Sequence, residues 1–314
     1  MDEVYAMYHF IINSHAKSRL GHRIWNDIER YLREQKFEYK KYFTREAGHA
    51  ARVANQITSN KEEAPTIVVL GGDGTLNEVL NGLRYLDGVT LGYIPIGSSN
   101  DFARGMDISK DYLKELHKII YPKRFIRLDY GVATYGGKSK RFLVSSGIGF
   151  DAAVCHEVNH SPLKKIMNRL RIGKLTYGLV AIKQLAGIPY IKGKIIIDDK
   201  KVKTFDKIFF SSVHVQKYEG GGFMFCPDAD ATDGYIDLCV AENITRSRVL
   251  SILPSAKKGK HVTCPGIHIY RCKKAVFQMR RKQFVHIDGE TEEKTMFTEV
   301  RFETSPDKIR FIVG

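Results

Sequence analysis

GGDGTLNEVLNG, residues 71–82, follows directly after the apolar run Thr66–Leu70 and decides how the first half of the chain folds. The run is rich in β-branched residues and predicts a buried strand. Glycines permit a tight turn in which the backbone comes close to a polyphosphate. Thr75 then begins an amphipathic helix, whose free N–H groups and dipole favour an anion. The stretch therefore predicts a strand, a phosphate-binding turn and a helix, in that order.

A second stretch of the same design follows at once. The strand-like run Thr90–Ile94 ends in Pro-Ile-Gly at 95–97, and residues 98–104 begin another helix. Two neighbouring strand ends with small, hydroxyl and acidic residues suit a nucleotide crevice beside a parallel sheet. Asp73 is a poor direct partner for phosphate, but its carboxylate suits a Mg²⁺ ion, or its bound water, on the phosphates. The alternative is an ordinary turn between a strand and a helix.

The rest of the sequence shows two different patterns of secondary structure. Up to residue 130, strand-like and helical runs alternate, which predicts a parallel sheet covered by helices. The runs are Tyr8–Ile12, helix Leu20–Gln35, Glu38–Phe43, helix Arg45–Ser59, Thr66–Leu70, helix Thr75–Leu86 and Thr90–Ile94. From about residue 125, period-2 runs predict a mainly antiparallel sandwich. These runs are Arg127–Tyr135, Lys140–Ser146, Lys192–Asp198, Lys207–Val215, Tyr235–Ala241, Ile267–Arg271, Ala275–Met279 and Phe284–Ile287.

Composition and charge narrow the class of protein. The 314 residues, 43% of them hydrophobic, are enough for two packed domains, and no run approaches the roughly 20 apolar residues of a membrane span. The net charge of +15 predicts an anionic partner, either a membrane surface or nucleic acid. No nucleic-acid-binding motif is apparent, which favours the membrane. We expect a cytoplasmic protein, peripherally associated with the inner face of the membrane, with no nucleic-acid partner.

Several blocks occur in one order along nearly the whole chain. They are GGDGTLNE at 71–78, PIGSSNDFAR at 95–104, GIGFDA at 147–152, the glycines at 220–222, DGYID at 233–237 and DGE at 288–290. The ordered set resembles the diacylglycerol kinase and sphingosine kinase superfamily, in particular the bacterial soluble lipid kinases. The resemblance implies α/β plus β architecture: a phosphofructokinase-like N-terminal α/β domain and a C-terminal β-sandwich domain, with the active site in the cleft between them. The expected boundaries are 1–130, completed by 304–314, and 131–303.

The resemblance also implies a reaction and its residues. The γ-phosphate of ATP would pass to a lipid hydroxyl, most simply that of diacylglycerol to give phosphatidic acid. Asp288, supported by Glu290, would accept the hydroxyl proton, and Asp73, Asp101 and Asp129 would surround a catalytic Mg²⁺ and its waters. The ATP-binding residues would be Asn13, Ser14, His15, Ala16, Lys17, Thr44, Gly72, Asp73, Gly74, Thr75, Leu76, Asn77, Glu78 and Ser98.

A structural Mg²⁺ is implied by the same resemblance at Asp233, with the main-chain carbonyls of Asp230 and Tyr235, although Asp233-Gly234 equally fits a hairpin turn. Two positions depart from the family's pattern. Asn13-Ser14 replaces the family's usual Asn-Pro, and Gly97-Ser98 replaces its Gly-Thr. Serine keeps a hydroxyl that can donate to a phosphate.

Other patterns in the sequence favour different interpretations. HEVNH at 156–160 satisfies the HExxH pattern of zinc proteases, but Pro162 follows at once and no third ligand has the required spacing. Residues 131–139 resemble a phosphate-binding loop, but strand-like runs flank them, so we expect a hairpin turn. Trp25 falls at helical spacing with other apolar residues, which predicts a place in the core.

The basic and apolar segment Leu163–Pro189 predicts either a membrane contact or a pair of covering helices. A homodimer, an NAD kinase-like enzyme and a non-catalytic lipid-binding protein remain open alternatives.

Overall fold

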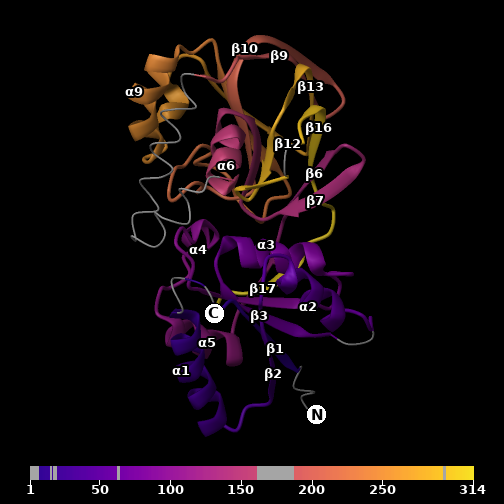
Figure 1. Cartoon of the computed structure of the whole chain (residues 1–314), viewed down its shortest axis with the longest axis vertical. Helices are drawn as coiled ribbons and strands as arrows, with labels where there is room; N and C mark the ends of the chain where they lie inside the picture. Colours follow the sequence, from indigo (N-terminus) through magenta and orange to yellow (C-terminus); the bar gives the residue numbers. More distant parts are fainter. Residues whose placement is uncertain (1–6, 15, 17–19, 62–63, 161–186, 293–294) are drawn as a thin grey trace. The chain divides into compact units, whose positions relative to one another are not determined.

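The computed structural model describes residues 7–14, 16, 20–61, 64–160, 187–292 and 295–314 (Figure 1). The chain divides into two compact units. The N-terminal unit comprises Met1–Tyr130 with Pro306–Gly314, and the C-terminal unit comprises Gly131–Ser305. Most of the segment 163–189, for which a membrane contact was predicted, lies outside the described residues. Within the described ranges, no helix has the length and apolar character needed to span a membrane.

The N-terminal unit contains one six-stranded sheet in the order β2-β1-β3-β4-β17-β5. The strands are β1 (Tyr8–Ile12), β2 (Tyr39–Phe43), β3 (Thr66–Gly71), β4 (Thr90–Pro95), β5 (Phe125–Leu128) and β17 (Ile309–Ile312). All neighbours pair in parallel except β5, which is antiparallel to β17. In Figure 1, β17 is yellow, as part of the chain's end, and lies among the purple elements of this unit.

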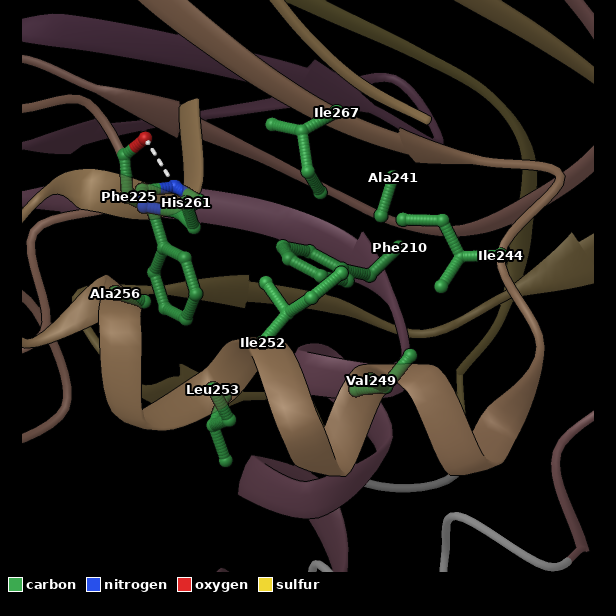
Figure 2. A pocket seen from close by; sticks show the side chains of 10 residues that line it. All are labelled: Phe210, Phe225, Ala241, Ile244, Val249, Ile252, Leu253, Ala256, His261 and Ile267. Carbon is green, nitrogen blue, oxygen red and sulfur yellow. Dashed lines mark hydrogen bonds between the residues drawn. The ribbon is translucent and has the colours of Figure 1, made fainter. Parts of the chain in front are cut away.

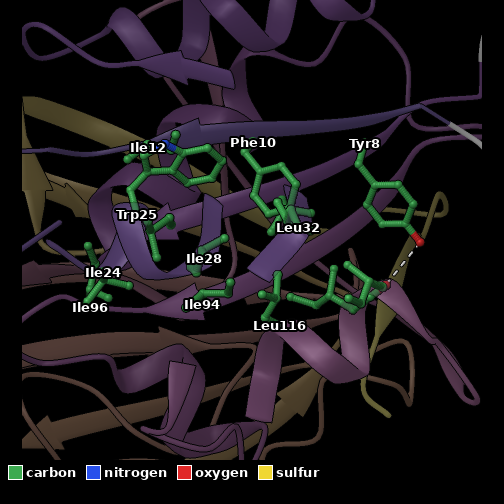
Figure 3. Packing of buried hydrophobic residues seen from close by; sticks show 14 of the residues in the cluster. Tyr8, Phe10, Ile12, Ile24, Trp25, Ile28, Leu32, Ile94, Ile96 and Leu116 are labelled. Carbon is green, nitrogen blue, oxygen red and sulfur yellow. Dashed lines mark hydrogen bonds between the residues drawn. The ribbon is translucent and has the colours of Figure 1, made fainter. Parts of the chain in front are cut away.

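Helices cover this sheet because they carry apolar side chains at helical spacing. They are α1 (Leu20–Glu34), α2 (His49–Ile57), α3 (Asp73–Gly82), α4 (Asp101–Gly105) and α5 (Tyr112–Ile120). Figure 3 shows the core that α1 and α5 form with alternate residues of β1, with Trp25 packed 5.3 Å from Phe10 between ring centroids. The prediction that Trp25 belongs to the core is confirmed.

The C-terminal unit is an antiparallel sheet of 11 strands that curls on itself. The strands are β6 (Gly131–Tyr135), β7 (Lys138–Phe142), β8 (Ser145–Gly149), β9 (Ile191–Ile197), β10 (Lys201–His214), β11 (Ile236–Glu242), β12 (Ile267–Cys272), β13 (Lys274–Gln283), β14 (Val285–Ile287), β15 (Glu290–Thr291) and β16 (Phe297–Thr304). Its described helices are α6 (Phe150–His160), α9 (Arg246–Ala256) and a 3₁₀ turn at Lys260–Thr263. β8 lies between β14 and β10, which positions the end of β14 for the site below.

The predicted fold class is confirmed, as is the hairpin predicted at 131–139, which β6 and β7 form. The structure corrects several element boundaries. The run Arg127–Tyr135 is not one strand, because Asp129 and Tyr130 separate β5 of one unit from β6 of the other. The predicted helix Thr75–Leu86 begins two residues earlier, at Asp73, and ends at Gly82, because Leu83 is extended, with φ −62° and ψ 124°. The structure also adds α5, α6, α9 and β16, which the sequence patterns did not predict.

Candidate active site

The two glycine turns lie against each other at the carboxyl ends of β3 and β4. A Cβ atom at Gly97 would lie 2.5 Å from the Cα atom of Gly72 and 2.6 Å from Oδ1 of Asn100. The N–H of Ile96 donates to the carbonyl of Gly71 over 2.8 Å. A side chain at position 97 does not fit between the turns, so glycine is required there. The turns therefore form one continuous backbone surface.

Asp73 joins the second turn to the first. Its Oδ2 accepts the N–H of Asp101 over 3.0 Å, and its Oδ1 accepts the N–H of Phe102 over 3.2 Å. A carboxylate suits the free N–H groups at a helix start, and here it bonds the first residues of α4. Asn100, with φ 50°, turns the chain into that helix. Asp73 thus fixes the geometry of both turns through its own side chain.

The other two predicted acids of this unit are buried and paired with cations. Oδ1 of Asp101 lies 2.5 Å from Nη1 of Arg104. Oδ1 of Asp129, a residue with no exposed surface, lies 2.8 Å from Nζ of Lys308. A buried carboxylate requires such partners because burial alone disfavours its charge. Lys308 belongs to the C-terminal segment, so the end of the chain contributes to this site.

Tyr93 on β4 is a further site residue that the sequence did not single out. Burial raises the pKa of its hydroxyl well above its ordinary value, and the nearby charges of Asp73 and Asp101 raise the pKa further. Among the described residues, its hydroxyl oxygen has no hydrogen-bond partner. A buried hydroxyl without a partner is destabilising. The position beside two acids therefore suits a water molecule or a hydrated cation.

Residues at the ends of β1 and β2 adjoin the first turn of α3. Nδ2 of Asn13 donates to Oγ1 of Thr75 over 3.0 Å, which links the end of β1 to α3. The N–H of Thr44 donates to the carbonyl of Ile12 over 2.9 Å. Ser14 is buried, whereas Ser98 is exposed. Of the other predicted ATP residues in this region, His15 and Lys17 lie outside the described residues, and Ala16 packs against the core.

The later residues of the GGDGTLNE block serve the fold. Leu76 is buried, and its N–H donates to the carbonyl of Gly72 over 3.1 Å. Oε2 of Glu78 accepts the N–H of Ala50 over 3.1 Å, which anchors the start of α2. Oδ1 of Asn77 accepts from Nδ2 of Asn81 over 3.1 Å. The candidate nucleotide surface is therefore carried mainly by residues 72–75, where the backbone turns.

Asp288 occupies a two-residue turn between β14 and β15. Its φ is 46° and that of Gly289 is 82°, which defines a tight left-handed hairpin turn. Oδ2 of Asp288 accepts the N–H of Leu143 over 3.0 Å, and its Oδ1 accepts the N–H groups of Val144 and Ser145 over 2.9 and 3.0 Å. Three N–H donors fix the position of the carboxylate. Glu290 follows the turn and is exposed.

A cluster of charged side chains lies under this turn, and the sequence did not reveal it. Nε2 of His286 lies 3.2 Å from Oδ2 of Asp151 and 3.7 Å from Oε1 of Glu219. Nε2 of His214 lies 3.1 Å from Oε2 of Glu219. Burial opposes the charge of His286, but the two carboxylates outweigh burial and raise its pKa. Burial raises the pKa of Asp151, which His286 counters.

Only part of this cluster carries a signal in the sequence. Asp151 lies in the GIGFDA block and His286 lies two residues before Asp288 of DGE, but Glu219 belongs to no block that points to the other two. The side-chain ligand atoms of these three residues lie within 4.8 Å of one another, a spacing that a metal ion could bridge.

The predicted structural magnesium site has the form of a turn. Oδ1 of Asp233 accepts the N–H of Tyr235 over 2.9 Å, and the N–H of Asp233 donates to the carbonyl of Asp230 over 3.5 Å. The guanidinium of Arg271 pairs with Oδ2 of Asp233 and lies over the ring of Tyr235. A cationic side chain thus lies where the resemblance places a metal ion.

An apolar pocket lies between α9 and the sheet of the C-terminal unit (Figure 2). Val249, Ile252 and Leu253 line it from α9, while Phe210 and Ala241 line it from the strands. Its volume is about 20 Å³, close to that of a single water site. A longer apolar ligand would fit only if α9 moved away from the strands.

Two family models together match nearly all residues of the chain. Residues 7–133 match the diacylglycerol kinase catalytic domain, and residues 143–313 match the YegS C-terminal NAD kinase beta sandwich-like domain. The chain therefore belongs to the diacylglycerol kinase family and is a lipid kinase. The resemblance found in the sequence is confirmed, and kinase activity implies ATP as the phosphate donor.

Individual relatives agree with this assignment. "Putative lipid kinase YtlR" of Bacillus subtilis is 32% identical over 306 residues, covering 96% of this chain and 97% of the relative. "Diacylglycerol kinase" of the same organism is 29% identical, covering 82% of each chain. For the fold alone, a crystal structure of a diacylglycerol kinase from Bacillus anthracis is similar to this chain, with a TM-score of 0.70 at 21% identity, covering 98% of this chain and 96% of that one.

One further structure concerns the fold alone. An NAD kinase from Archaeoglobus fulgidus superposes with a TM-score of 0.53 at 13% identity, covering 98% of this chain and 93% of that one. The two kinds of kinase thus share an architecture, and a shared architecture does not define a substrate.

Proposed function

We propose that this lipid kinase transfers the γ-phosphate of ATP to the hydroxyl of diacylglycerol and forms phosphatidic acid. The observation that carries the proposal is the Asp288 carboxylate, which three backbone N–H groups hold in one position on a tight turn. A fixed carboxylate suits the removal of a proton from an attacking hydroxyl. Diacylglycerol is the proposed acceptor because relatives named "Diacylglycerol kinase" align with most of this chain.

The nucleotide is assigned to the N-terminal unit. The backbone of residues 72–75 and the start of α3 would bind the phosphates, since glycine turns expose N–H groups and a helix N-terminus favours anions. Asn13 and Thr75 lie together at this surface, and Ser98 is exposed on the second turn. We assign the phosphate contacts to these residues first.

Mg²⁺ fits the acids of the same unit. The carboxylates of Asp73 and Asp101 and the nearby hydroxyl of Tyr93 offer oxygen atoms, which this ion prefers. Asp129 would accept hydrogen bonds from water molecules bound to the Mg²⁺ ion. When bound, Mg²⁺ would neutralise charge on the phosphates.

The proposed chemical step uses Asp288 as the base. The O–H bond of the lipid breaks and its proton passes to the Asp288 carboxylate, while the lipid oxygen forms a new bond to the γ-phosphorus. The bond from that phosphorus to the bridging oxygen breaks in line, and ADP leaves with the electron pair. Glu290, two residues further along the chain, would support Asp288 by favouring its protonation, since a nearby like charge raises the affinity of a carboxylate for a proton. Positioning supplies much of the rate, because the reactants are held together.

The acyl chains and the membrane belong to the proposal as well. The pocket under α9 would receive part of an acyl chain once α9 moves, since its lining is apolar. The net charge of +15 favours contact with an anionic bilayer surface, where the lipid resides. The enzyme would then work as a peripheral protein on the cytoplasmic leaflet.

A lipid phosphorylation assay tests the proposed substrate. Purified protein would receive γ-labelled ATP and vesicles of phosphatidylglycerol that contain diacylglycerol, a sphingoid base or total bacterial lipid. We expect label in phosphatidic acid only when diacylglycerol is present. Label on another lipid would replace the proposed substrate. A parallel reaction would receive NAD in place of the vesicles, and label on NAD would indicate an NAD kinase. If the protein bound ATP but transferred no phosphate, it would be a non-catalytic lipid-binding protein.

We also propose that the turn at 230–235 holds a structural Mg²⁺, supported by the Asp233 carboxylate and the nearby carbonyl of Asp230. Because Arg271 pairs with that carboxylate, the ion and the guanidinium would compete. We expect millimolar Mg²⁺ to raise the melting temperature of the wild-type protein, and to do so less for Asp233→Asn. An equal rise in both proteins, measured by thermal unfolding without nucleotide, would locate the effect elsewhere.

A further inference from the structure

Three hydrogen bonds hold the backbone of the turn that carries Asp288. The N–H of Asp288 donates to the carbonyl of Ser145 over 2.8 Å. Nδ2 of Asn159, on α6, donates to the carbonyl of Gly289 over 2.9 Å. The N–H of Gly289 donates to Nδ1 of His286 over 3.3 Å. The position of the carboxylate therefore depends on α6, on β8 and on one imidazole.

The hydrogen bonds of His286 define its tautomer. Because Nδ1 accepts the N–H of Gly289, the ring proton of the neutral imidazole is on Nε2. That N–H points to Oδ2 of Asp151, 3.2 Å away, with Glu219 3.7 Å away. An Nε2 that carries a proton has no lone pair for a metal ion. The arrangement therefore favours a hydrogen-bonded acid–imidazole cluster over a metal site.

The backbone leaves room for this cluster at a single glycine. A Cβ atom at Gly147 would collide with Oδ2 of Asp151 and would lie 2.9 Å from Nε2 of His286. Gly147 is also the residue opposite His286 in the pairing of β8 with β14. The imidazole can reach the α6 carboxylate only because no side chain intervenes there. The cluster therefore depends on the pairing of β8 with β14 within the sheet.

We propose that His286 is a positioning residue for the proposed base: oriented by Asp151 and Glu219, its imidazole accepts the Gly289 N–H and so holds the turn of Asp288. The inference rests on the proposed function, because it concerns the same carboxylate. It also accounts for the HEVNH segment, whose Asn159 holds the other side of Gly289. His156 of that segment stacks on Phe284, with 4.0 Å between ring centroids.

The arrangement makes activity depend on pH. A second ring proton on His286 would sit on Nδ1 and face the Gly289 N–H, so two donors would oppose each other and release the turn. The groups facing the ring are Asp151 from α6, Glu219 from the loop after β10 and Asp288 from the turn itself, and all three raise the pKa of His286 above 6.5. Activity is therefore expected to fall as the pH is lowered through this raised pKa.

Stability has the opposite dependence. A pKa that is higher in the folded than in the unfolded state contributes stability that is complete below the unfolded pKa and is lost as pH rises through the folded pKa. His286 should thus stabilise the fold most at the acidic pH at which activity is low. His214, on the far side of Glu219, lowers the pKa of that carboxylate and so helps keep the cluster charged.

Two isosteric substitutions separate the two ring contacts. Asparagine places its oxygen near the position of Nδ1, so His286→Asn keeps the acceptor for Gly289, whereas His286→Gln keeps a donor for Asp151 and loses that acceptor. We expect kcat to fall about 100-fold in His286→Gln and less than about tenfold in His286→Asn, with the KM for ATP unchanged. Neither variant should show the acid limb of the pH profile. His156→Asn, on α6 and in contact with Thr291 of β15, is the control and should keep both kcat and that limb.

Equal losses of kcat in the two variants, in proportion to their melting temperatures, would reduce His286 to a packing role and overturn the inference. If the variants do not fold, ¹⁵N NMR of the wild-type histidine rings decides. We expect a proton on Nε2 and none on Nδ1 of His286 at pH values where the enzyme is active, and the reverse tautomer would also overturn it. If the wild-type protein phosphorylates no lipid, the proposed function is refuted instead. The tautomer of His286 would then still show whether its Nδ1 accepts the Gly289 N–H.

Discussion

Asp288→Asn is expected to reduce kcat by a factor of about 100 to 10,000, the range that general-base catalysis contributes. The amide is neutral and cannot take the proton of the lipid hydroxyl. Asparagine tolerates the positive φ of 46° at this position, so the hairpin should survive. Initial rates with saturating diacylglycerol measure kcat, and titration with a fluorescent ATP analogue measures nucleotide binding, which should not change.

Asp198 offers a matched control for this substitution. It also has a positive φ, 49°, and its Oδ1 accepts the N–H groups of Lys273 and Lys274 over 2.9 and 3.0 Å. Asp198→Asn therefore removes a comparable set of carboxylate hydrogen bonds in the same unit, outside the family's motifs. It should lower the melting temperature and leave kcat alone. If Asp288→Asn retained wild-type turnover, the base would have to be sought elsewhere.

Gly97→Ala is expected to weaken ATP binding by a factor of about 10 to 100. The added Cβ would lie 2.5 Å from the Cα atom of Gly72, so the two turns must separate. Such overpacking costs about 1–3 kcal/mol, and each 1.4 kcal/mol that falls on binding corresponds to a factor of about ten in Kd. Titration of the Kd for Mg·ATP measures the effect directly.

Gly187→Ala controls for the loss of a glycine, because a Cβ there meets no atom of the described residues within 4 Å. The control should bind ATP as the wild type does. If Gly97→Ala bound ATP normally and folded normally, the paired turns would not form the nucleotide surface, and the assignment of residues 72–75 to the phosphates would fail.

Local patterns predicted the N-terminal unit well because its signals are local. A buried strand, a glycine turn and an amphipathic helix each need only neighbouring residues to be recognised, as in Thr66–Gly71 with α3. Predictions were poorer where a neighbour in space decides the boundary. Gly82 ends α3 where a Cβ would collide with the backbone of Ala51. The run Arg127–Tyr135 divides between two units, which its alternation of side chains does not reveal.

The sequence alone determined the family, the parallel sheet with its two glycine turns, and the identity of most acids, because these depend on residue type and order. Tertiary structure alone brought Lys308 to Asp129, Tyr93 to Asp73, and Glu219 to His286. Hydrogen bonds and ion pairs act over about 3 Å, so a contact between residues far apart in the chain exists only once the intervening elements have packed. Which acids are free to react, and which are already bonded, is for this reason a property of the fold.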